Sequence, residues 1–155
     1  MVKVDPLKAV KSILVAVDGS EASYNALATV CDIARHTKAQ VAVLHVIEVP
    51  RALPLDADLR AEAEHGEDVL TQAERLGDDH RIKVRGELVQ ARQAGVAIVD
   101  EATANESDAI ALGLGFEGPF GRFQLDEVSQ YVLEHAPCDV WLFRYAASQT
   151  REHEA

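Results

Sequence analysis

Short apolar runs alternate along the chain with longer segments in which apolar residues recur at helical spacing. Runs rich in valine, isoleucine and leucine are typical of strands buried on both faces of a sheet. We expect strands at about residues 13–17, 41–47, 82–89, 109–112 and 139–143. We expect helices at about residues 21–37, 58–78, 93–105 and 126–136. This alternation predicts βαβ units, and therefore an α/β fold of the Rossmann-like type: a three-layer α/β/α sandwich around a five-stranded parallel sheet.

Single residues in this pattern predict where the helices begin and bend. Ser20 is a good N-cap for the first long helix, and Asp126 for the last. Gly66 lies inside the second helix, where glycine costs about 1 kcal/mol relative to alanine, so we expect a bend there. No linker divides the 155 residues, so we expect one domain at 1–155 with its core at about 10–145 and a polar tail at 146–155.

Composition and charge narrow the classes of partner. The net charge is −11, and aromatic residues make up 5% of the chain. An acidic surface with few rings for base stacking disfavours nucleic acid and anionic membranes as partners. Cys31 and Cys138 match no metal spacing, and we expect buried, reduced thiols, as in a cytoplasmic protein. The same location is expected because we find no signal peptide and no apolar run near the roughly 20 residues of a membrane helix.

Two turns carry residues suited to ligand binding. Asp18-Gly19-Ser20 follows the first strand, and Gly113-Leu114-Gly115 follows the fourth. In doubly wound sheets, ligands bind beyond the carboxyl ends of the strands, at the point where the strand order reverses. If the first and fourth strands are neighbours at that point, both turns face one crevice.

Four segments in order give the chain a resemblance to the universal stress protein family. They are ILVAVDGS at 13–20, LHV at 44–46, the glycine loop from Gly113, and YVLEHAPC at 131–138. The resemblance spans nearly the whole chain. It implies the strand order 3-2-1-4-5 of the adenine nucleotide alpha hydrolase-like fold, and a homodimer in which the last strand pairs with its two-fold mate.

The strand that this resemblance places in the dimer interface contains Val140, Trp141, Leu142 and Phe143. An apolar edge strand left bare invites association, and symmetric pairs are the commonest oligomers. The alternative is that Trp141 and Phe143 are covered by the protein's own helices or tail.

The resemblance also identifies a remodelled nucleotide loop. Members of the family that bind ATP carry Gly, two residues, Gly, nine residues, Gly, and then Ser or Thr. Aligned on Val128, the chain keeps the first glycine as Gly113, has Phe116 in place of the second, and has Asp126-Glu127 in place of the final pair. Other glycines that would make a shifted loop permissive are Gly115, Gly118 and Gly121.

The replaced pair changes the electrostatics of the helix that it opens. A helix N-terminus attracts anions, but Asp126 and Glu127 place the protein's own carboxylates there. A phosphate arriving at this point meets negative charge, which Arg122 or a divalent metal such as Mg²⁺ would offset in part. We therefore expect weak or absent ATP binding.

Two further residues match positions that lie near the nucleoside in ATP-binding members. They are Asp18 after the first strand and Val43 in the second. The alternative is that Asp18 closes its turn and Val43 belongs to the core. The candidate nucleotide site as a whole comprises Val17, Asp18, Val43, Gly113, Gly115, Arg122, Asp126, Glu127 and Val128.

Two functions stay open after this reading. The first is a non-enzymatic stress-response or regulatory homodimer that binds ATP weakly or not at all. The second is a signalling module that holds ATP or AMP, with Mg²⁺, in an altered pose. Two further alternatives are that the site binds a different small ligand, or that the chain acts on a protein partner such as a transporter. Catalysis and metal binding lack support, because His45 and His135 suit structural roles and no nucleophile-base pair or metal motif is present.

Overall fold

The computed structural model describes residues 5–115 and 125–146. A short helix, α1 (Pro6–Ala9), comes first, and Pro6 stands at its start, where proline needs no hydrogen-bond partner. The strands are β1 (Ser12–Ala16), β2 (Gln40–Glu48), β3 (Val84–Ala91), β4 (Ala109–Leu114) and β5 (Asp139–Arg144). The long helices are α2 (Glu21–Thr37), α3 (Arg60–Asp79), α4 (Ala94–Ala104) and α5 (Glu127–His135). Every predicted strand and helix is present, and only α1 was not expected.

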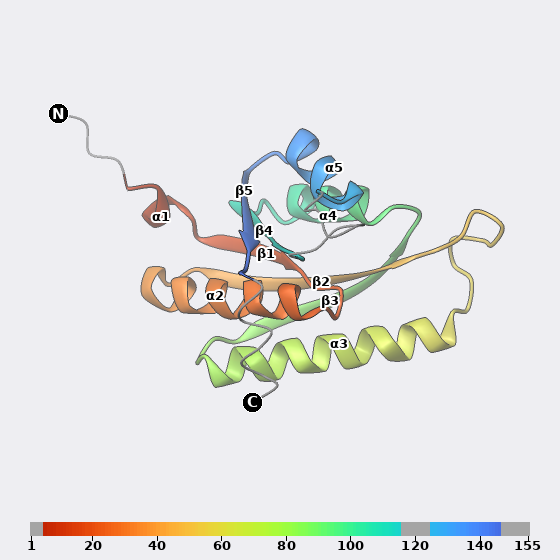
Figure 1. Cartoon of the computed structure of the whole chain (residues 1–155), viewed down its shortest axis with the longest axis horizontal. Helices are drawn as coiled ribbons and strands as arrows, with labels where there is room; N and C mark the ends of the chain where they lie inside the picture. The colour runs from red at the N-terminus through yellow and green to blue at the C-terminus, as the bar shows by residue number, and fades with distance from the viewer. Residues whose placement is uncertain (1–4, 116–124, 147–155) are drawn as a thin grey trace.

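All five strands lie parallel in one sheet, in the order β3-β2-β1-β4-β5. Figure 1 shows α2 and α3 on one face of the sheet and α4 and α5 on the other. The predicted three-layer α/β/α fold and its strand order are therefore confirmed. The order reverses at β1, so the carboxyl ends of β1 and β4 flank the switch point at which such sheets bind ligands.

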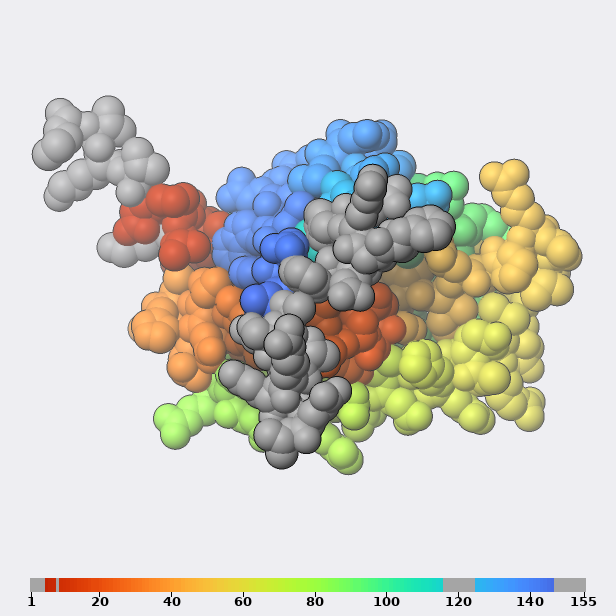
Figure 2. All heavy atoms as spheres, in the orientation of Figure 1, coloured from red at the N-terminus to blue at the C-terminus, as the bar shows by residue number. Residues whose placement is uncertain are grey.

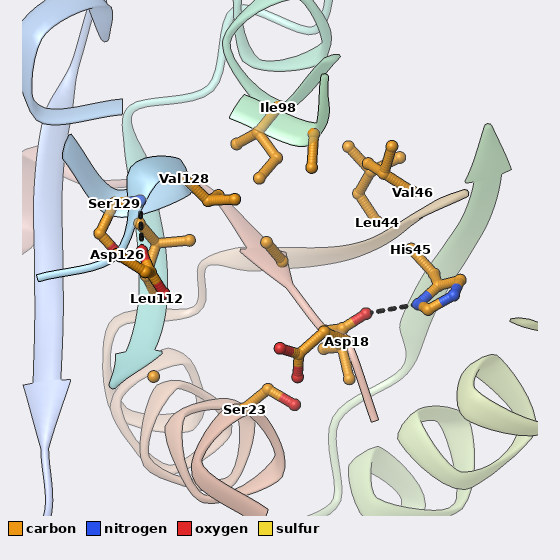
Figure 3. A pocket seen from close by; sticks show the side chains of 14 residues that line it. Asp18, Ser23, Leu44, His45, Val46, Ile98, Leu112, Asp126, Val128 and Ser129 are labelled. Atoms are coloured by element: carbon orange, nitrogen blue, oxygen red, sulfur yellow. Dashed lines mark hydrogen bonds between the residues drawn. The ribbon is translucent and has the colours of Figure 1, made fainter. Parts of the chain in front are cut away.

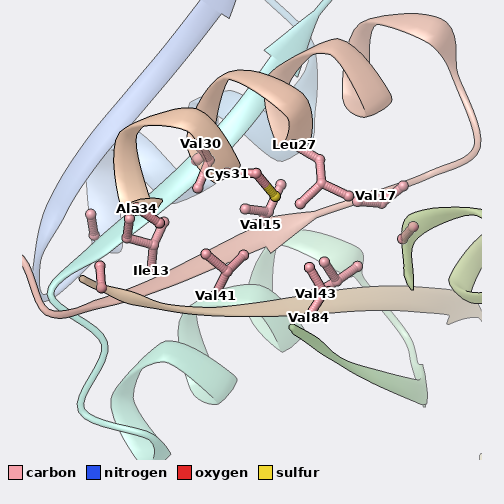
Figure 4. Packing of buried hydrophobic residues seen from close by; sticks show 14 of the residues in the cluster. Ile13, Val15, Val17, Leu27, Val30, Cys31, Ala34, Val41, Val43 and Val84 are labelled. Carbon is pink, nitrogen blue, oxygen red and sulfur yellow. The ribbon is translucent and has the colours of Figure 1, made fainter. Parts of the chain in front are cut away.

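The central strand is buried on both faces because its residues are apolar without alternation. Ile13 and Val15 point into a cluster with α2 and α3, shown in Figure 4, and Leu14 points into a second cluster beneath α4 and α5. All three side chains are at most 1% exposed. Burial of this kind contributes roughly 25 cal/mol for each Å² of apolar surface, so the two clusters hold β1, and the turn that follows it, in place.

Helix α3 runs without interruption through Gly66, where we expected a bend. The glycine instead allows a close approach of α3 to the sheet. A Cβ atom at Gly66 would lie 2.7 Å from Leu88 Cδ1 and 3.0 Å from His45 Cδ2. Neither α3 nor any other helix in the two described ranges is long and apolar enough to cross a membrane.

Strand β5 is the edge strand that the sequence assigned to a dimer. Its four apolar residues are half-buried: Trp141 and Phe143 pack against the cluster under α2, and Val140 and Leu142 against the cluster under α5. The chain's own helices thus cover part of this strand, while its outer edge has no partner strand within the described residues.

Candidate functional site

A cavity opens at the switch point, between the carboxyl ends of β1, β2 and β4 and the first turns of three helices. Figure 3 shows apolar side chains of β2, α4 and α5 on one side of it, facing Asp18 and Ser23 on the other. The lining residues are Ala16, Val17, Asp18, Ser23, Leu44, His45, Val46, Ala94, Ile98, Leu112, Gly113, Asp126, Val128 and Ser129. Both predicted turns therefore do face one crevice.

Asp18 closes the turn from β1 into α2. Its Oδ1 accepts a hydrogen bond from the backbone N–H of Ser20 at 2.9 Å, and Gly19 supplies the φ of 91° that the turn requires. Burial raises the pKa of Asp18, but hydrogen bonds from Ser20 and Ser23 outweigh this and hold it below the ordinary value of 3.8. Asp18 therefore stays charged at neutral pH. It lines the cavity and also closes the turn into α2.

Gly113 lies where the end of β4 crosses the first turn of α2. A Cβ atom at this position would overlap the carbonyl oxygen of Ala22, so packing alone requires glycine. Gly115, two residues later, is exposed, and a Cβ atom there would meet nothing within 4 Å. The two glycines of this turn thus differ: the packing requires a glycine at position 113, whereas a larger residue would fit at position 115.

The start of α5 is capped by the protein's own carboxylate. Asp126 Oδ1 accepts a hydrogen bond from the backbone N–H of Ser129 at 2.7 Å, which uses one of the free donors of the first turn. Glu127 follows in the same turn, but it lines a separate hollow with Glu48 and Tyr131. Asp126 is therefore the acidic residue of this pair that faces the cavity.

Charge in the cavity is negative. Asp18 and Asp126 line it, and no lysine or arginine does so among the residues that the structure describes. Within the same residues, no group of three or more His, Cys, Asp or Glu side chains is placed to hold a metal ion. Arg122 and the other loop residues Phe116, Gly118 and Gly121 lie outside the described residues.

Strand β2 contributes residues other than the one we expected. Val43 is fully buried in the cluster under α2 and does not line the cavity. Side chains alternate along a strand, so Leu44 and Val46 point to the opposite face, where they form part of the apolar wall. His45 is buried and donates from Nδ1 to the carbonyl oxygen of Val17 at 2.7 Å, the structural role predicted for it.

Several lining residues were absent from the sequence-based set: Ser23, Leu44, Val46, Ala94, Ile98, Leu112 and Ser129. Ala94 and Ile98 stand four residues apart on α4, a spacing that places them on one face of a helix. Only the position of α4 over the switch point shows that this face meets the cavity. Among the candidates of the sequence, Val17, Asp18, Gly113, Asp126 and Val128 do line it.

The cavity is small for a nucleotide. Its volume is about 100 Å³, whereas pockets for drug-sized molecules usually span about 300–1,000 Å³. A ligand larger than this cavity would extend beyond its lining, which includes Asp18 and Asp126. The cavity thus suits one ring system against its apolar wall, with any polar extension near the two carboxylates.

Comparison with known proteins relates the whole fold to one family. The model of the universal stress protein family matches residues 9–144. A universal stress protein of Methanocaldococcus jannaschii is 26% identical over 136 residues, which are 84% of this chain and 79% of that protein. The structure of the Archaeoglobus fulgidus universal stress protein in complex with dAMP is similar at a TM-score of 0.68 and 19% identity, over 85% of this chain and 96% of that one. The structure of a universal stress protein family protein from Arabidopsis thaliana with AMP bound has a TM-score of 0.68 to this chain and 18% sequence identity. The match covers 90% of this chain and 95% of that one.

Proposed function

Because the chain belongs to the universal stress protein family, we propose that it is a regulatory homodimer of the stress response whose switch-point site binds ATP weakly or not at all. One observation carries this proposal: the first turn of α5, where a phosphate would bind, is already capped by Asp126 at 2.7 Å. We propose that the protein acts by binding rather than by catalysis, because the sequence presents no nucleophile-base pair.

The cap opposes phosphate in two ways. It occupies a backbone donor that would otherwise bind the anion, and it adds a negative charge where the helix dipole favours one. Two unit charges about 4 Å apart repel by about 1 kcal/mol in water and by about 4 kcal/mol at an effective dielectric of 20. Because a triphosphate carries several charges past both Asp18 and Asp126, the penalty rises with the number of phosphates.

The test is a titration of the full chain with ATP, with and without Mg²⁺, in which the melting temperature of the protein is measured at each ligand concentration. Saturating ligand at a hundredfold excess over Kd would stabilise the fold by about 2.7 kcal/mol. We expect almost no shift for the wild type and a clear one for Asp126→Gly with Glu127→Ser. The control, Asp126→Asn with Glu127→Gln, removes the charge and keeps a capping oxygen. Equal ATP binding by the wild type and the double variant would show that the acidic cap is not what excludes ATP.

An adenine ligand with fewer phosphates is the second candidate function. It is favoured by the apolar wall of Leu44, Val46, Ile98 and Val128, and by relatives of the same fold that hold dAMP or AMP. Pairing of β1 with β2 ends at Ala16 and Leu44, so Val46 lies beyond the neighbouring strand and its backbone is placed to meet a base edge. The same titration with AMP decides this: a shift with AMP that exceeds the shift with ATP supports it.

The proposed homodimer forms through β5. Support comes from the half-buried row Val140, Trp141, Leu142 and Phe143 on an edge strand, since bare apolar edges invite pairing. We expect a dimer at micromolar concentration in sedimentation analysis, and a monomer for Trp141→Lys. A wild-type monomer would contradict the dimer and leave the proposal about ATP unaffected. The proposed location is the cytoplasm, because the two free cysteines suit a reducing compartment. The proposed regulated partner is another protein, such as a transporter.

A further inference from the structure

The opposite edge of the sheet, at β3, is open. Strand β3 pairs with β2 alone among the described residues. The Val49 N–H donates to the Ala91 carbonyl at 2.8 Å, so the backbone of Ala91 faces β2. Because backbone groups alternate in direction along a parallel strand, those of Gly86, Leu88 and Gln90 face outward. This edge therefore offers a row of hydrogen-bonding groups to an incoming chain.

A groove of about 410 Å³ lies beside this edge, between β3 and α4. Its floor is apolar and half-buried, made by Val89, Ala91, Val96 and Ala97. Leu55 also lines the groove and is 49% exposed, a large apolar side chain left in contact with water. Helices α4 and α5 cover the rest of this face, as Figure 1 shows, and β3 projects beyond them.

The wall that carries Leu55 is held in place rather than loose. Arg92 Nη1 donates to the carbonyl oxygens of Pro50 at 2.7 Å and Leu53 at 2.8 Å. Gln90 Nε2 donates to the Leu55 carbonyl at 2.9 Å. Figure 2 shows this segment, in orange and yellow, projecting at one end of the molecule. A preorganised wall lowers the entropy that binding would otherwise cost.

The margin of the groove is acidic. Asp100 and Glu101 line it, and Arg92, the one cationic lining residue in the described part of the chain, donates to the loop carbonyls. The Glu101 side chain on α4 is the main cause that raises the pKa of Glu87 on β3, so the two carboxyl groups are neighbours. Arg85 acts on Glu87 in the opposite direction. Two carboxyl groups held together at an exposed edge are a favourable partner for a lysine or arginine brought by another chain.

We propose that the β3 edge and its groove bind an extended, basic segment of a partner protein, which adds to the sheet as a further strand. The backbone of the segment pairs with Gly86, Leu88 and Gln90. Its aliphatic side chains lie on Val89, Val96 and Ala97, and its basic side chains meet Glu87 and Glu101. Strand addition of this kind takes affinity from main-chain hydrogen bonds and specificity from alternate side chains. The proposal is independent of what the switch-point cavity binds.

The test uses the full chain and a peptide as long as β3 in which every second residue is serine and the remaining positions, which all point to one face of a strand, carry valine and lysine in turn. Binding is measured by isothermal titration calorimetry at physiological ionic strength. Two control peptides separate the contributions: one with glutamate in place of lysine, and one N-methylated at alternate residues so that it cannot pair with a strand. We expect the glutamate peptide to bind at least about tenfold more weakly, because opposite charges at an interface become like charges. We expect the N-methylated peptide not to bind.

Variants of the protein locate the site. Glu101→Lys should weaken binding of the basic peptide by about tenfold, a change of 1.4 kcal/mol. The matched control, Glu134→Lys on the exposed face of α5, makes the same charge change elsewhere and should have little effect. Equal affinity of the two variants, or binding of the N-methylated peptide, would overturn the proposal. It would also be overturned if the protein alone formed a dimer that Ala97→Arg dissolves, because a second copy would then occupy the groove.

Discussion

Two helices begin at the same cavity with similar residues, but one has a neutral capping group and the other a charged one. Helix α2 opens with Ser20-Glu21-Ala22-Ser23, and its cap is the neutral Ser20 hydroxyl oxygen, 3.2 Å from the Ser23 N–H. Helix α5 opens with Asp126-Glu127-Val128-Ser129, and its cap is a carboxylate oxygen, 2.7 Å from the Ser129 N–H. Both caps satisfy a backbone donor, so they are equivalent for folding. Each helix also has a glutamate in its first turn, Glu21 in α2 and Glu127 in α5, so the two starts differ in the charge of the capping atom itself. A ligand in the cavity would meet that difference.

The two helix starts also differ in how they are packed, and this gives the largest expected effect. Gly113→Ala should destabilise the fold by about 3 kcal/mol, because the added Cβ overlaps the Ala22 carbonyl in the first turn of α2. Gly115→Ala is the matched control, with open space around the added atom, and should change the free energy of unfolding by less than about 0.5 kcal/mol. Urea unfolding measures both. Equal effects would mean that β4 does not lock the start of α2.

Removal of each cap in turn tests their equivalence for folding. Ser20→Ala and Asp126→Ala should each cost about 1 kcal/mol in urea unfolding, since each leaves a helix donor without its capping oxygen. The two should separate when salt is added. The part of the Asp126 contribution that comes from charge and helix dipole is screened, whereas the neutral Ser20 cap is unaffected. Identical salt dependence of the two variants would contradict the proposed charge difference.

A smaller effect is expected from pH, through the carboxylate of Asp18 in the turn before α2. The folded pKa of Asp18 lies below 3.8, so its ionised form stabilises the fold. That contribution is complete above the ordinary value and is lost as the pH falls through the folded pKa. Asp18→Asn keeps an oxygen for the Ser20 N–H and removes the charge. The difference in free energy of unfolding between wild type and variant should therefore be constant near neutral pH and shrink on acidification below pH 3.8. A difference that grows on acidification would contradict this.

The fold was predictable from the sequence because its signals are local. The unbroken apolar run at 13–17 indicated a strand covered on both faces, and Ser20 and Asp126 indicated the helix starts that the structure shows. The site was predictable only in part. Its turns follow from strand ends, but the sequence left Val43 either beside the nucleoside or in the core, and the structure has it in the core cluster because neighbouring residues of a strand point to opposite faces.

Other parts of the site depend on contacts between elements far apart in the sequence. Ala94 and Ile98 reach the cavity only because the crossover places α4 above β1 and β2. From the sequence alone, Gly66 is only a residue that destabilises a helix. The structure explains it, because Leu88 and His45 leave no room for a side chain there. Such roles follow from tertiary packing, which no local pattern of apolar and polar residues encodes.

Gly113 has a consequence for how nucleotide loops are recognised in chains of this kind. Its lack of a side chain allows the end of β4 to contact the backbone of α2, and the fold requires this contact whether or not the chain binds a phosphate. The leading glycine of such a loop is therefore a marker of architecture. Evidence for a bound nucleotide has to come from the far end of the loop, where the helix either leaves its first amide groups free or satisfies them itself.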